Sequence, residues 1–398
     1  MRIAYIGDLR KGTTSRSRFN AICLANKGIE PIPVDISVPI LKTNRIFRSY
    51  GWRYYRGPLI DNVNKFIADS LNGTFDLIWV DKGYFIYPST LLKIKTITNK
   101  IVHYTPDVAF VKYQSKLFTD SIHLYDLCYT TKSFEIEFYK TKCKEVVFCA
   151  QGFDSEMLNN KFDIEKKKGV IFIGLFEKSR KRIIDVLLKN NIEVKLGGVG
   201  WYLYYLQNRK NKNLKYLGSK VFGTNYISEI SNSMFGLGLM SKKFMELHTT
   251  RTFEIPACGT ILITEKNVET LSFFNPDEVI FFEDIYDIPS LINDTKNHIE
   301  LALKGRNRVV NDVRDYMGFF KIEFDFFHRY DLTVLMGIFK DNSEVFYRSD
   351  FDKKNKADIR TLVLEKNARD KHDKKIQNRI IVALFFCLII GLALTLIK

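Results

Sequence analysis

Short apolar runs alternate with amphipathic, helix-like segments along the first 330 residues of the chain. Runs that are apolar on both faces are typical of parallel strands that helices cover on each side. The pattern predicts two series of five strands, at residues 2–6, 75–80, 100–104, 124–130 and 145–149 and at residues 170–174, 192–196, 234–240, 260–264 and 278–282.

Helix-like segments, for example at residues 178–190, separate several of these strands. Strands that alternate with helices favour an α/β fold with parallel sheets. A charged segment, Glu165-Lys-Lys-Lys168, lies between the two series. We therefore predict two Rossmann-like domains, at residues 1–160 and 168–330, that face each other across a cleft.

The C-terminus carries a different pattern. Residues 380–397 form a run of 18 residues without a charge, about 27 Å long as a helix at roughly 1.5 Å per residue. Residues 353–379 hold ten Lys/Arg against four Asp/Glu. The positive-inside rule then predicts a charged juxtamembrane stalk at 331–379, a single-pass membrane anchor at 380–397 and a cytoplasmic catalytic part. The alternative is a buried C-terminal core helix.

The overall charge of the chain indicates which classes of molecule it is expected to bind. Sixty-one Lys/Arg against 45 Asp/Glu give a net charge of +16, which favours anionic partners such as nucleotide phosphates, an anionic membrane surface or nucleic acid. No helix-turn-helix, zinc or RNP signal is visible, and positive charge is enriched near the C-terminus, so we expect no nucleic-acid partner. The six cysteines contain no C-x-x-C pair, which favours a reducing compartment.

A glycine-containing loop follows the first strand at residues 7–14 and precedes a helix. It matches neither the Walker A sequence nor G-x-G-x-x-G. Because ligands bind at the carboxyl ends of strands in open α/β sheets, Gly12, Thr13 and Arg16 are candidates for contact with the acceptor substrate. A plain strand-to-helix turn is the alternative.

The strongest constellation lies at residues 242–265, KKFMELHTTRTFEIPACGTILITE. Glu246 and Glu254 are eight positions apart, an E-x7-E pair. That spacing alone is weak support, because Glu137 and Glu145 form another such pair. The residues around Glu254 therefore carry the argument.

Thr249 or Thr250 is expected to cap a short helix that begins near Arg251. Pro256 is expected to keep that helix short, because proline is tolerated only near a first turn. Free N–H groups and Arg251 would then converge on a site suited to a pyrophosphate, so these three residues are donor-binding candidates. The Glu254 carboxylate can accept hydrogen bonds from vicinal hydroxyls of a ribose or sugar. The alternative is a glutamate that merely offsets the helix dipole.

Residues 251–265, RTFEIPACGTILITE, resemble the signature of CgeB-like glycosyltransferases of the group-1 type. The resemblance covers roughly residues 1–330 and implies a GT-B fold, with a nucleotide-sugar donor held mainly by the C-terminal domain and no obligatory metal or cofactor. Three further stretches agree with it in the family's order: residues 80–83 (VDKG), residues 104–107 (YTPD) with Tyr125-Asp126 downstream, and residues 170–174 (VIFIG) with Arg180.

The resemblance also implies roles for individual residues. Glu254 would lie near the donor ribose and Glu246 near the donor sugar, which makes both catalytic candidates. Gly174 and Arg180 would approach the diphosphate. Fixed cations would stabilise the charge that develops on the departing nucleoside diphosphate.

The sequence identifies no acceptor-side general base. His103 and Asp107 lie at a strand end of the first domain and are candidates, and structural roles are the alternative for both. If the group-1 analogy holds, the mechanism is retaining and needs no conventional base.

Asp350 and Asp352 form a D-x-D sequence of the kind that holds Mg²⁺ or Mn²⁺ in metal-dependent glycosyltransferases. The pair follows the second strand series and adjoins Lys353 and Lys354. We interpret it as surface chemistry and expect no metal site.

These observations predict a membrane-tethered glycosyltransferase of hexosyltransferase type. It would move a sugar, without a metal, from a nucleotide-sugar donor to a glycan, lipid-linked or protein acceptor. The alternative is a non-catalytic GT-B-like protein with a structural or glycan-binding role.

Overall fold

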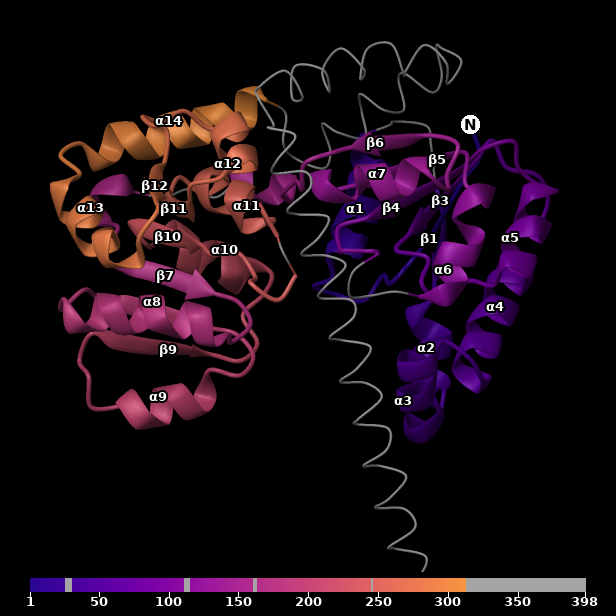
Figure 1. Ribbon diagram of the computed structural model, residues 1–398, viewed down its shortest axis with the longest axis horizontal. Helices are drawn as coiled ribbons and strands as arrows, with labels where there is room; N and C mark the ends of the chain where they lie inside the picture. Colours follow the sequence, from indigo (N-terminus) through magenta and orange to yellow (C-terminus); the bar gives the residue numbers. More distant parts are fainter. Residues whose placement is uncertain (26–30, 111–114, 160–162, 245, 313–398) are drawn as a thin grey trace, which may run out of the picture. The chain divides into compact units, whose positions relative to one another are not determined.

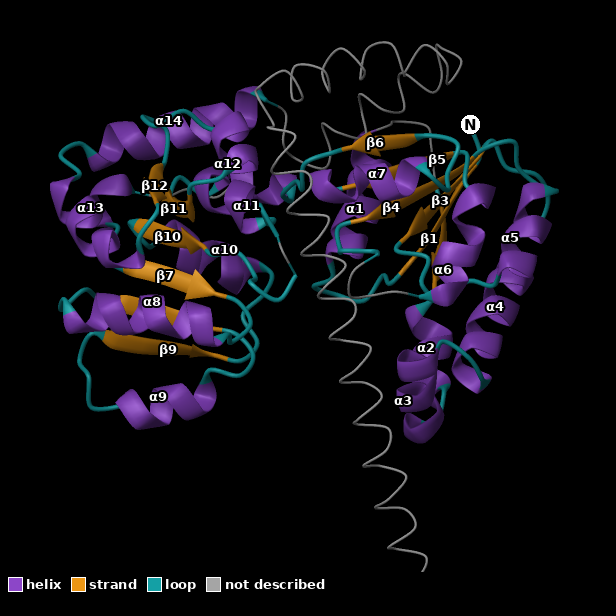
Figure 2. Ribbon diagram, viewed as in Figure 1, coloured by secondary structure: helices purple, strands orange, loops and turns teal. Residues whose placement is uncertain are grey.

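The computed structural model describes residues 1–25, 31–110, 115–159, 163–244 and 246–312. Within these ranges the strands form two six-stranded sheets, and helices alternate with the strands along the chain (Figures 1 and 2). Every strand pair in both sheets is parallel.

The first sheet has the strand order β2-β1-β3-β4-β5-β6. Its strands are β1 (Ile3–Gly7), β2 (Ile32–Asp35), β3 (Leu77–Asp81), β4 (Ile101–Thr105), β5 (Leu127–Thr130) and β6 (Val146–Phe148). The helices of this part of the chain are α1 (Thr14–Ala25), α2 (Ser37–Lys42), α3 (Arg45–Tyr54), α4 (Pro58–Ser70), α5 (Pro88–Lys95), α6 (Lys116–Ser121) and α7 (Ile136–Lys140).

The second sheet has the order β12-β11-β10-β7-β8-β9. Its strands are β7 (Val170–Ile173), β8 (Val194–Gly197), β9 (Leu214–Gly218), β10 (Phe235–Gly238), β11 (Ile261–Glu265) and β12 (Ile280–Phe282). Its helices are α8 (Lys178–Lys189), α9 (Tyr202–Asn208), α10 (Thr224–Ser231), α11 (Arg251–Ala257), α12 (Val268–Phe273), α13 (Ile288–Asp294) and α14 (His298–Asn311).

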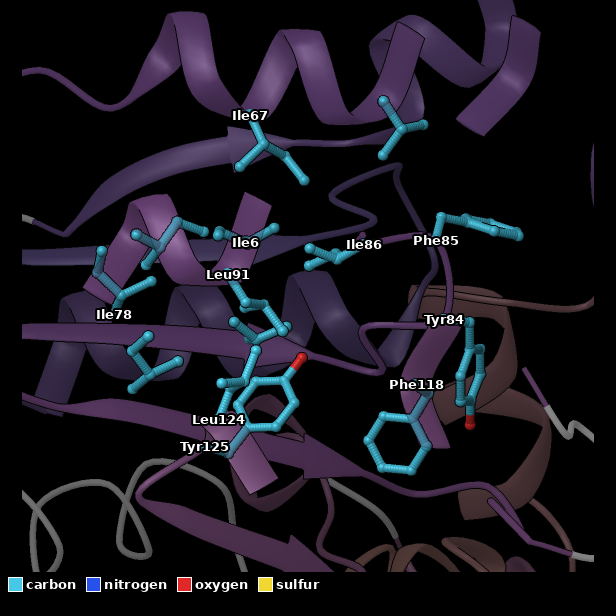
Figure 3. Close-up of a cluster of buried hydrophobic side chains, with 14 of the residues drawn as sticks. Ile6, Ile67, Ile78, Tyr84, Phe85, Ile86, Leu91, Phe118, Leu124 and Tyr125 are labelled. Carbon is cyan, nitrogen blue, oxygen red and sulfur yellow. The ribbon is translucent and has the colours of Figure 1, made fainter. Parts of the chain in front are cut away.

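Both faces of the first sheet are buried, which explains its continuous apolar runs. Successive side chains of a strand point to opposite faces, so Ile78 and Val80 of β3 enter one core while Leu77 and Trp79 enter another. Figure 3 shows the first of these cores, where side chains from strands and helices meet. Its labelled members are Ile6, Ile67, Ile78, Tyr84, Phe85, Ile86, Leu91, Phe118, Leu124 and Tyr125.

All ten strands expected from the apolar runs are present, and two strands were not foreseen. The unforeseen strands, β2 and β9, lie at an edge of their respective sheets. Pro33 interrupts the apolar run of β2, and Lys215 in β9 is exposed. Since an edge strand has a neighbour on only one side, it needs no continuous apolar run.

The sheets occupy residues 3–148 and 170–282, and the exact domain boundaries stay a prediction. No helix within the described ranges combines the length and apolarity needed to cross a bilayer. Several predicted features lie outside the described residues: the end of the second domain (313–330), the stalk (331–379), the anchor (380–397) and the D-x-D sequence at Asp350.

Gly51 sets how closely α3 approaches α4. It is buried, and a Cβ atom at this position would lie 2.5 Å from the Cβ of Leu59. We expect Gly51→Ala to lower the free energy of unfolding by about 1–3 kcal/mol, because one side must move to admit the methyl group. A lower urea midpoint would show this, whereas Ser49→Ala on the exposed side of α3 should not reproduce the loss. Equal midpoints for both variants would contradict the prediction.

Candidate functional site

The carboxyl ends of β7 and β8 bring two glycine-containing turns into contact. The Gly174 N–H donates to the Gly197 carbonyl (3.0 Å), and the Gly174 carbonyl accepts from the Trp201 indole (2.9 Å). Gly198 has a φ of +116°, and a Cβ there would lie 2.2 Å from the Gly174 oxygen. This packing admits only glycine at Gly198. Gly174 thus lies at the carboxyl end of β7, the edge where ligands bind in open α/β folds, and its contact with a diphosphate stays a prediction.

Arg180 on α8 is buried at the same sheet edge, with 4% of its surface exposed. Its Nη1 donates to the Leu175 carbonyl and its Nη2 to the Leu239 carbonyl, both at 3.1 Å. The side chain therefore ties together the loops after β7 and β10. Its Nε has no hydrogen-bond acceptor among the described residues. Burial and the nearby Arg251 guanidinium lower the pKa of Arg180.

Arg251, the first residue of α11, lies close to Arg180. The Cζ atoms of Arg180 and Arg251 are 5.6 and 5.8 Å from the centroid of the same ring, that of Phe172. The Nε of Arg251 is also buried and lacks an acceptor in the described part of the chain. Arg180 is buried and Arg251 is partly buried, and their like charges repel. The buried Glu177 carboxylate, 3.4 Å from the Arg180 Nη1, offsets part of this charge, and the remainder favours an anion as a further partner.

Glu254 lies one helical turn after Thr250, on the same short helix as Arg251. Its Oε2 accepts a hydrogen bond of 2.6 Å from the Tyr226 hydroxyl on α10. Burial raises the pKa of Glu254, while the Tyr226 hydrogen bond and the Arg251 charge act in the opposite direction. The sequence did not indicate Tyr226, because it lies 28 positions away on another helix.

The predicted helix begins at Arg251, but the predicted cap is wrong. Thr250 occupies the N-cap position with helical φ and ψ of −53° and −37°, and its side chain makes no cap hydrogen bond. An N-cap side chain reaches the first turn from an extended backbone conformation, which Thr250 does not have. Instead, the Thr249 N–H donates to the Thr252 hydroxyl (3.1 Å). The Thr249 hydroxyl is buried and has no hydrogen-bond partner among the described residues.

Glu246, in the part of the chain that forms the second sheet, makes an ion pair with a lysine from the part that forms the first sheet. Its Oε1 lies 3.5 Å from the Nζ of Lys132, which follows β5 of the first sheet. The Lys132 side chain is 2% exposed, and its Nζ has no hydrogen-bond partner within the described residues. Sequence reasoning missed Lys132. The one available signal was its place just after a strand, at the carboxyl edge of the sheet.

A buried network joins the same two regions beside this ion pair. The Ser133 hydroxyl donates to Glu269, whose other carboxylate oxygen is 2.5 Å from the His248 Nδ1. The His248 Nε2 accepts from the Gln151 N–H at 2.9 Å. Because Nε2 is the acceptor, the ring proton belongs on Nδ1, where it faces Glu269. The network therefore fixes the segment that carries Glu246 and leads into α11.

Gly12 and Thr13 lie on the loop between β1 and α1, and Arg16 lies in the first turn of α1. The Thr13 hydroxyl donates to carbonyl oxygens within its own loop, and the Arg16 Nη1 donates to the Leu9 carbonyl (3.1 Å). Both contacts shape the turn itself. Gly12 has a φ of +85°, and its Cβ position lies 3.5 Å from the ring of Phe222, which precedes α10. The loop thus adjoins the second sheet's helices.

The two acceptor-side base candidates occupy different environments. His103 is fully buried with its ring 4.6 Å from that of Phe118, and burial lowers its pKa to about 4. Its Nε2 lies 3.1 Å from the Lys82 carbonyl. Asp107 is 31% exposed on its side chain and pairs with the Lys82 ammonium at 2.7 Å. Of the two, only Asp107 is accessible to an acceptor in this structure.

Taken together, the site holds two buried cations, Arg180 and Lys132, and the partly buried Arg251 beside the carboxylates Glu177, Glu246 and Glu254. Charges in a poorly solvated site act on an incoming anion more strongly than they would in water. Such a site can bind a phosphate ester and stabilise charge that develops on it. Among the described residues, no group of three or more His, Cys, Asp or Glu side chains could hold a metal ion.

Residues 179–314 match a family model described as glycosyl transferase-like. This stretch contains Arg180, Glu246, Arg251 and Glu254. No curated protein matches the chain.

Solved structures with the same arrangement cover most of the chain. HepE of Anabaena, determined with UDP, is 13% identical over 82% of this chain and 98% of its own, with a TM-score of 0.51. A trehalose-6-phosphate synthase studied for glycosyltransfer with retention is 10% identical over 83% of this chain and all of its own (TM-score 0.57). A glycosyltransferase of Rickettsia africae is 11% identical over 82% and 97%, with a TM-score of 0.53. At these identities the likeness shows the fold, which is GT-B-like with two parallel sheets, as predicted.

Proposed function

We propose that the protein is a glycosyltransferase that uses a nucleotide-sugar donor. The pairing of Arg180 and Arg251 carries the proposal, because both guanidinium groups are held at one ring and each leaves a buried Nε–H without an acceptor among the described residues. The glycosyl transferase-like match and the HepE structures with UDP and UDP-glucose support it.

In this proposal each side chain has a distinct role. Arg180 and Arg251, with the backbone at Gly174, bind the diphosphate of the donor. Glu254, oriented by the Tyr226 hydroxyl, accepts hydrogen bonds from the ribose. Charge grows on the leaving diphosphate as the glycosidic bond to the donor breaks, and the two guanidinium groups stabilise it without a metal.

Glu246 is proposed to contact the transferred sugar. Its ion pair with Lys132 places a cation from the first sheet beside that carboxylate. Thr249 and Thr250 complete the donor-binding segment. We propose a retaining reaction of the group-1 type, in which the acceptor needs no conventional base, and assignment to the CgeB-like group. Retention in the structurally similar trehalose-6-phosphate synthase supports the stereochemistry.

Acceptor and location are also proposals. The loop with Gly12, Thr13 and Arg16, together with Asp107, is proposed to face a glycan, lipid-linked or protein acceptor. The apolar run at 380–397 and its basic flank support a tether at an anionic membrane with the catalytic part on the cytoplasmic side.

Calorimetric titration of the protein with UDP, GDP, ADP and CDP tests the donor class. We expect one nucleoside diphosphate to bind best, and Glu254→Gln to weaken its binding about tenfold through the loss of one charged hydrogen-bond acceptor. Tyr226→Phe should weaken binding less, because Glu254 keeps its charge. Glu300→Gln on α14, whose carboxylate is exposed, is the matched control.

Absence of binding by all four nucleoside diphosphates would contradict the proposal. The non-catalytic GT-B-like scaffold would then be the better interpretation. Binding that Glu254→Gln and Glu300→Gln leave equally unchanged would remove Glu254 from the donor site while keeping the donor class.

A further inference from the structure

Helix α3 is exposed on nearly all sides although it is rich in large apolar residues. Ile46 is 76% exposed, Phe47 50% and Trp52 49%. Six of the 21 large apolar side chains that are exposed in the described part of the chain fall between residues 41 and 54. Monomeric soluble proteins seldom gather such side chains in one patch unless the patch binds something.

The patch is also strongly basic. Residues 36–60, which include α2 and α3, contain five Lys/Arg and no Asp or Glu. The cations are Lys42, Arg45, Arg48, Arg53 and Arg56. A surface that combines exposed aromatic and aliphatic side chains with a net positive charge fits the boundary between lipid headgroups and acyl chains.

The basic and aromatic side chains lie together on α3 and directly after it. The Cζ atoms of Arg53 and Arg56 lie 5.7 and 5.9 Å from the ring centroid of Tyr54, and the rings of Tyr50 and Tyr54 are 4.9 Å apart. A shallow cavity on this side of the helix is lined by Arg45, Ile46, Ser49, Tyr50, Arg53 and Tyr54. The opposite side of the helix, at Gly51, packs against Leu59 of α4. The fold therefore fixes which side of α3 faces outward.

The position of α3 in the first sheet's domain is compatible with docking. In Figure 1, α3 lies beyond α2 and away from the strands of the first sheet. Its connection starts at the carboxyl end of β2, where the Ile36 N–H donates to the Gly7 carbonyl (3.0 Å). The basic, aromatic segment is thus tethered next to the start of the loop that carries Gly12.

We propose that α3 docks this domain onto an anionic phospholipid surface. Ile46, Tyr50 and Tyr54, on the side of α3 opposite Gly51, enter the headgroup boundary, while the arginines pair with lipid phosphates. Trp52, whose ring centroid is 4.6 Å from that of Phe85, lies at the edge of this surface. Trp and Tyr side chains favour this depth because one part of each ring system is apolar and the other polar. The absence of acidic residues from 36–60 favours lipid phosphate over a second copy of this chain, because two such patches would repel.

This contact is distinct from the proposed anchor at 380–397, and it does not depend on sugar transfer. A test must therefore report on α3 itself. Trp52 allows this, because the chain has three tryptophans and the other two, Trp79 and Trp201, are fully buried. The full-length protein is mixed with vesicles of phosphatidylcholine, alone or with about one-third phosphatidylglycerol, that carry bromine on the acyl chains.

With the anionic vesicles, we expect the emission of Trp52 to shift to shorter wavelength and to be quenched several-fold more than the emission of Trp52→Phe. Joint reversal of Arg45 and Arg53 to glutamate should weaken the partitioning of α3 about tenfold or more, and added salt should act in the same direction. Ile46→Asp should reduce quenching as well. Leu92→Asp is its matched control, because Leu92 is 53% exposed on α5 of the same domain.

Two results would overturn the proposal. One is Trp52 emission that stays unchanged while sedimentation shows the protein bound to the vesicles, which would mean that another segment makes the contact. The other is Trp52 that is already shielded from acrylamide without vesicles. Shielding that grows with protein concentration would indicate a second copy, and constant shielding would indicate another segment of the same chain.

Discussion

Arg251→Met should lower kcat/KM for sugar transfer from the preferred donor by about 100-fold or more. Methionine keeps an unbranched apolar side chain beside Phe172 but removes the charge that would face the leaving diphosphate. Initial rates over a range of donor concentrations measure the effect. Lys181→Met is the matched control, because Lys181 is 39% exposed on α8 and pairs with Asp185 outside the site. Similar rates for the two variants would contradict the assigned role.

The two kinetic constants separate the possible effects of Arg251. If its guanidinium acts mainly on charge that develops during bond cleavage, kcat falls more than KM rises. A rise in KM alone would mean that Arg251 only holds the donor. Arg180 is the less informative target, because it also donates to the Leu175 and Leu239 carbonyls and its loss would disturb two loops.

The sequence predicted those parts of the fold that burial dictates directly. A strand buried on both faces needs apolar side chains at consecutive positions, as in β3, and this pattern is visible without any partner. The edge strand β2 lacked that pattern, since Pro33 interrupts it and only one neighbouring strand pairs with it. Sequence reasoning therefore found the strands at the centre of each sheet and missed an edge strand in each.

In the candidate site, too, contacts between neighbouring residues could be predicted from the sequence, whereas long-range contacts could not. Arg251 and Glu254 lie within one short segment, so their proximity follows from local structure. Lys132 and Glu246 are far apart in sequence, and only the folded chain brings their charges to within 3.5 Å. The Thr250 cap failed for a local reason, because residue preferences do not specify the φ and ψ that the backbone adopts before α11.

For His103 the structure favours the structural role that the sequence left as the alternative. A histidine at the end of a buried strand fits a general base on residue type alone, yet its ring packs among Phe118, Tyr125 and Tyr139. Alternation along β4 places it on a covered face of the sheet, and the sequence does not specify how fully the helices cover that face. Burial keeps its pKa low, so the neutral ring is the form that the core holds.

Glu269→Gln should lower the free energy of unfolding at neutral pH by about 3–5 kcal/mol, because breaking a buried charged network leaves its partners unsatisfied. Ser133 and His248 both form hydrogen bonds with this carboxylate, although they lie 115 positions apart in the sequence (248 − 133). Urea unfolding monitored by circular dichroism measures the change. Glu283→Gln, which alters an exposed ion pair with Lys266, should have little effect.

At acidic pH, the difference in the free energy of unfolding between the natural protein and Glu269→Gln should become much smaller. Burial raises the pKa of Glu269, but His248, Ser133 and Lys132 outweigh burial, so the pKa lies below its usual value in the folded protein. A carboxyl group of this kind stabilises the fold above its unfolded pKa, about 4.3, and the contribution is lost as pH falls through the lower folded value. The stability gap between the natural protein and Glu269→Gln should therefore narrow as pH drops below about 5. A gap that stays constant down to pH 3 would show that the glutamate acts through packing alone. A gap that closes would show that the charge of Glu269 helps to join the segment carrying Glu246 to Ser133, which follows β5, and through His248 to Gln151, which follows β6.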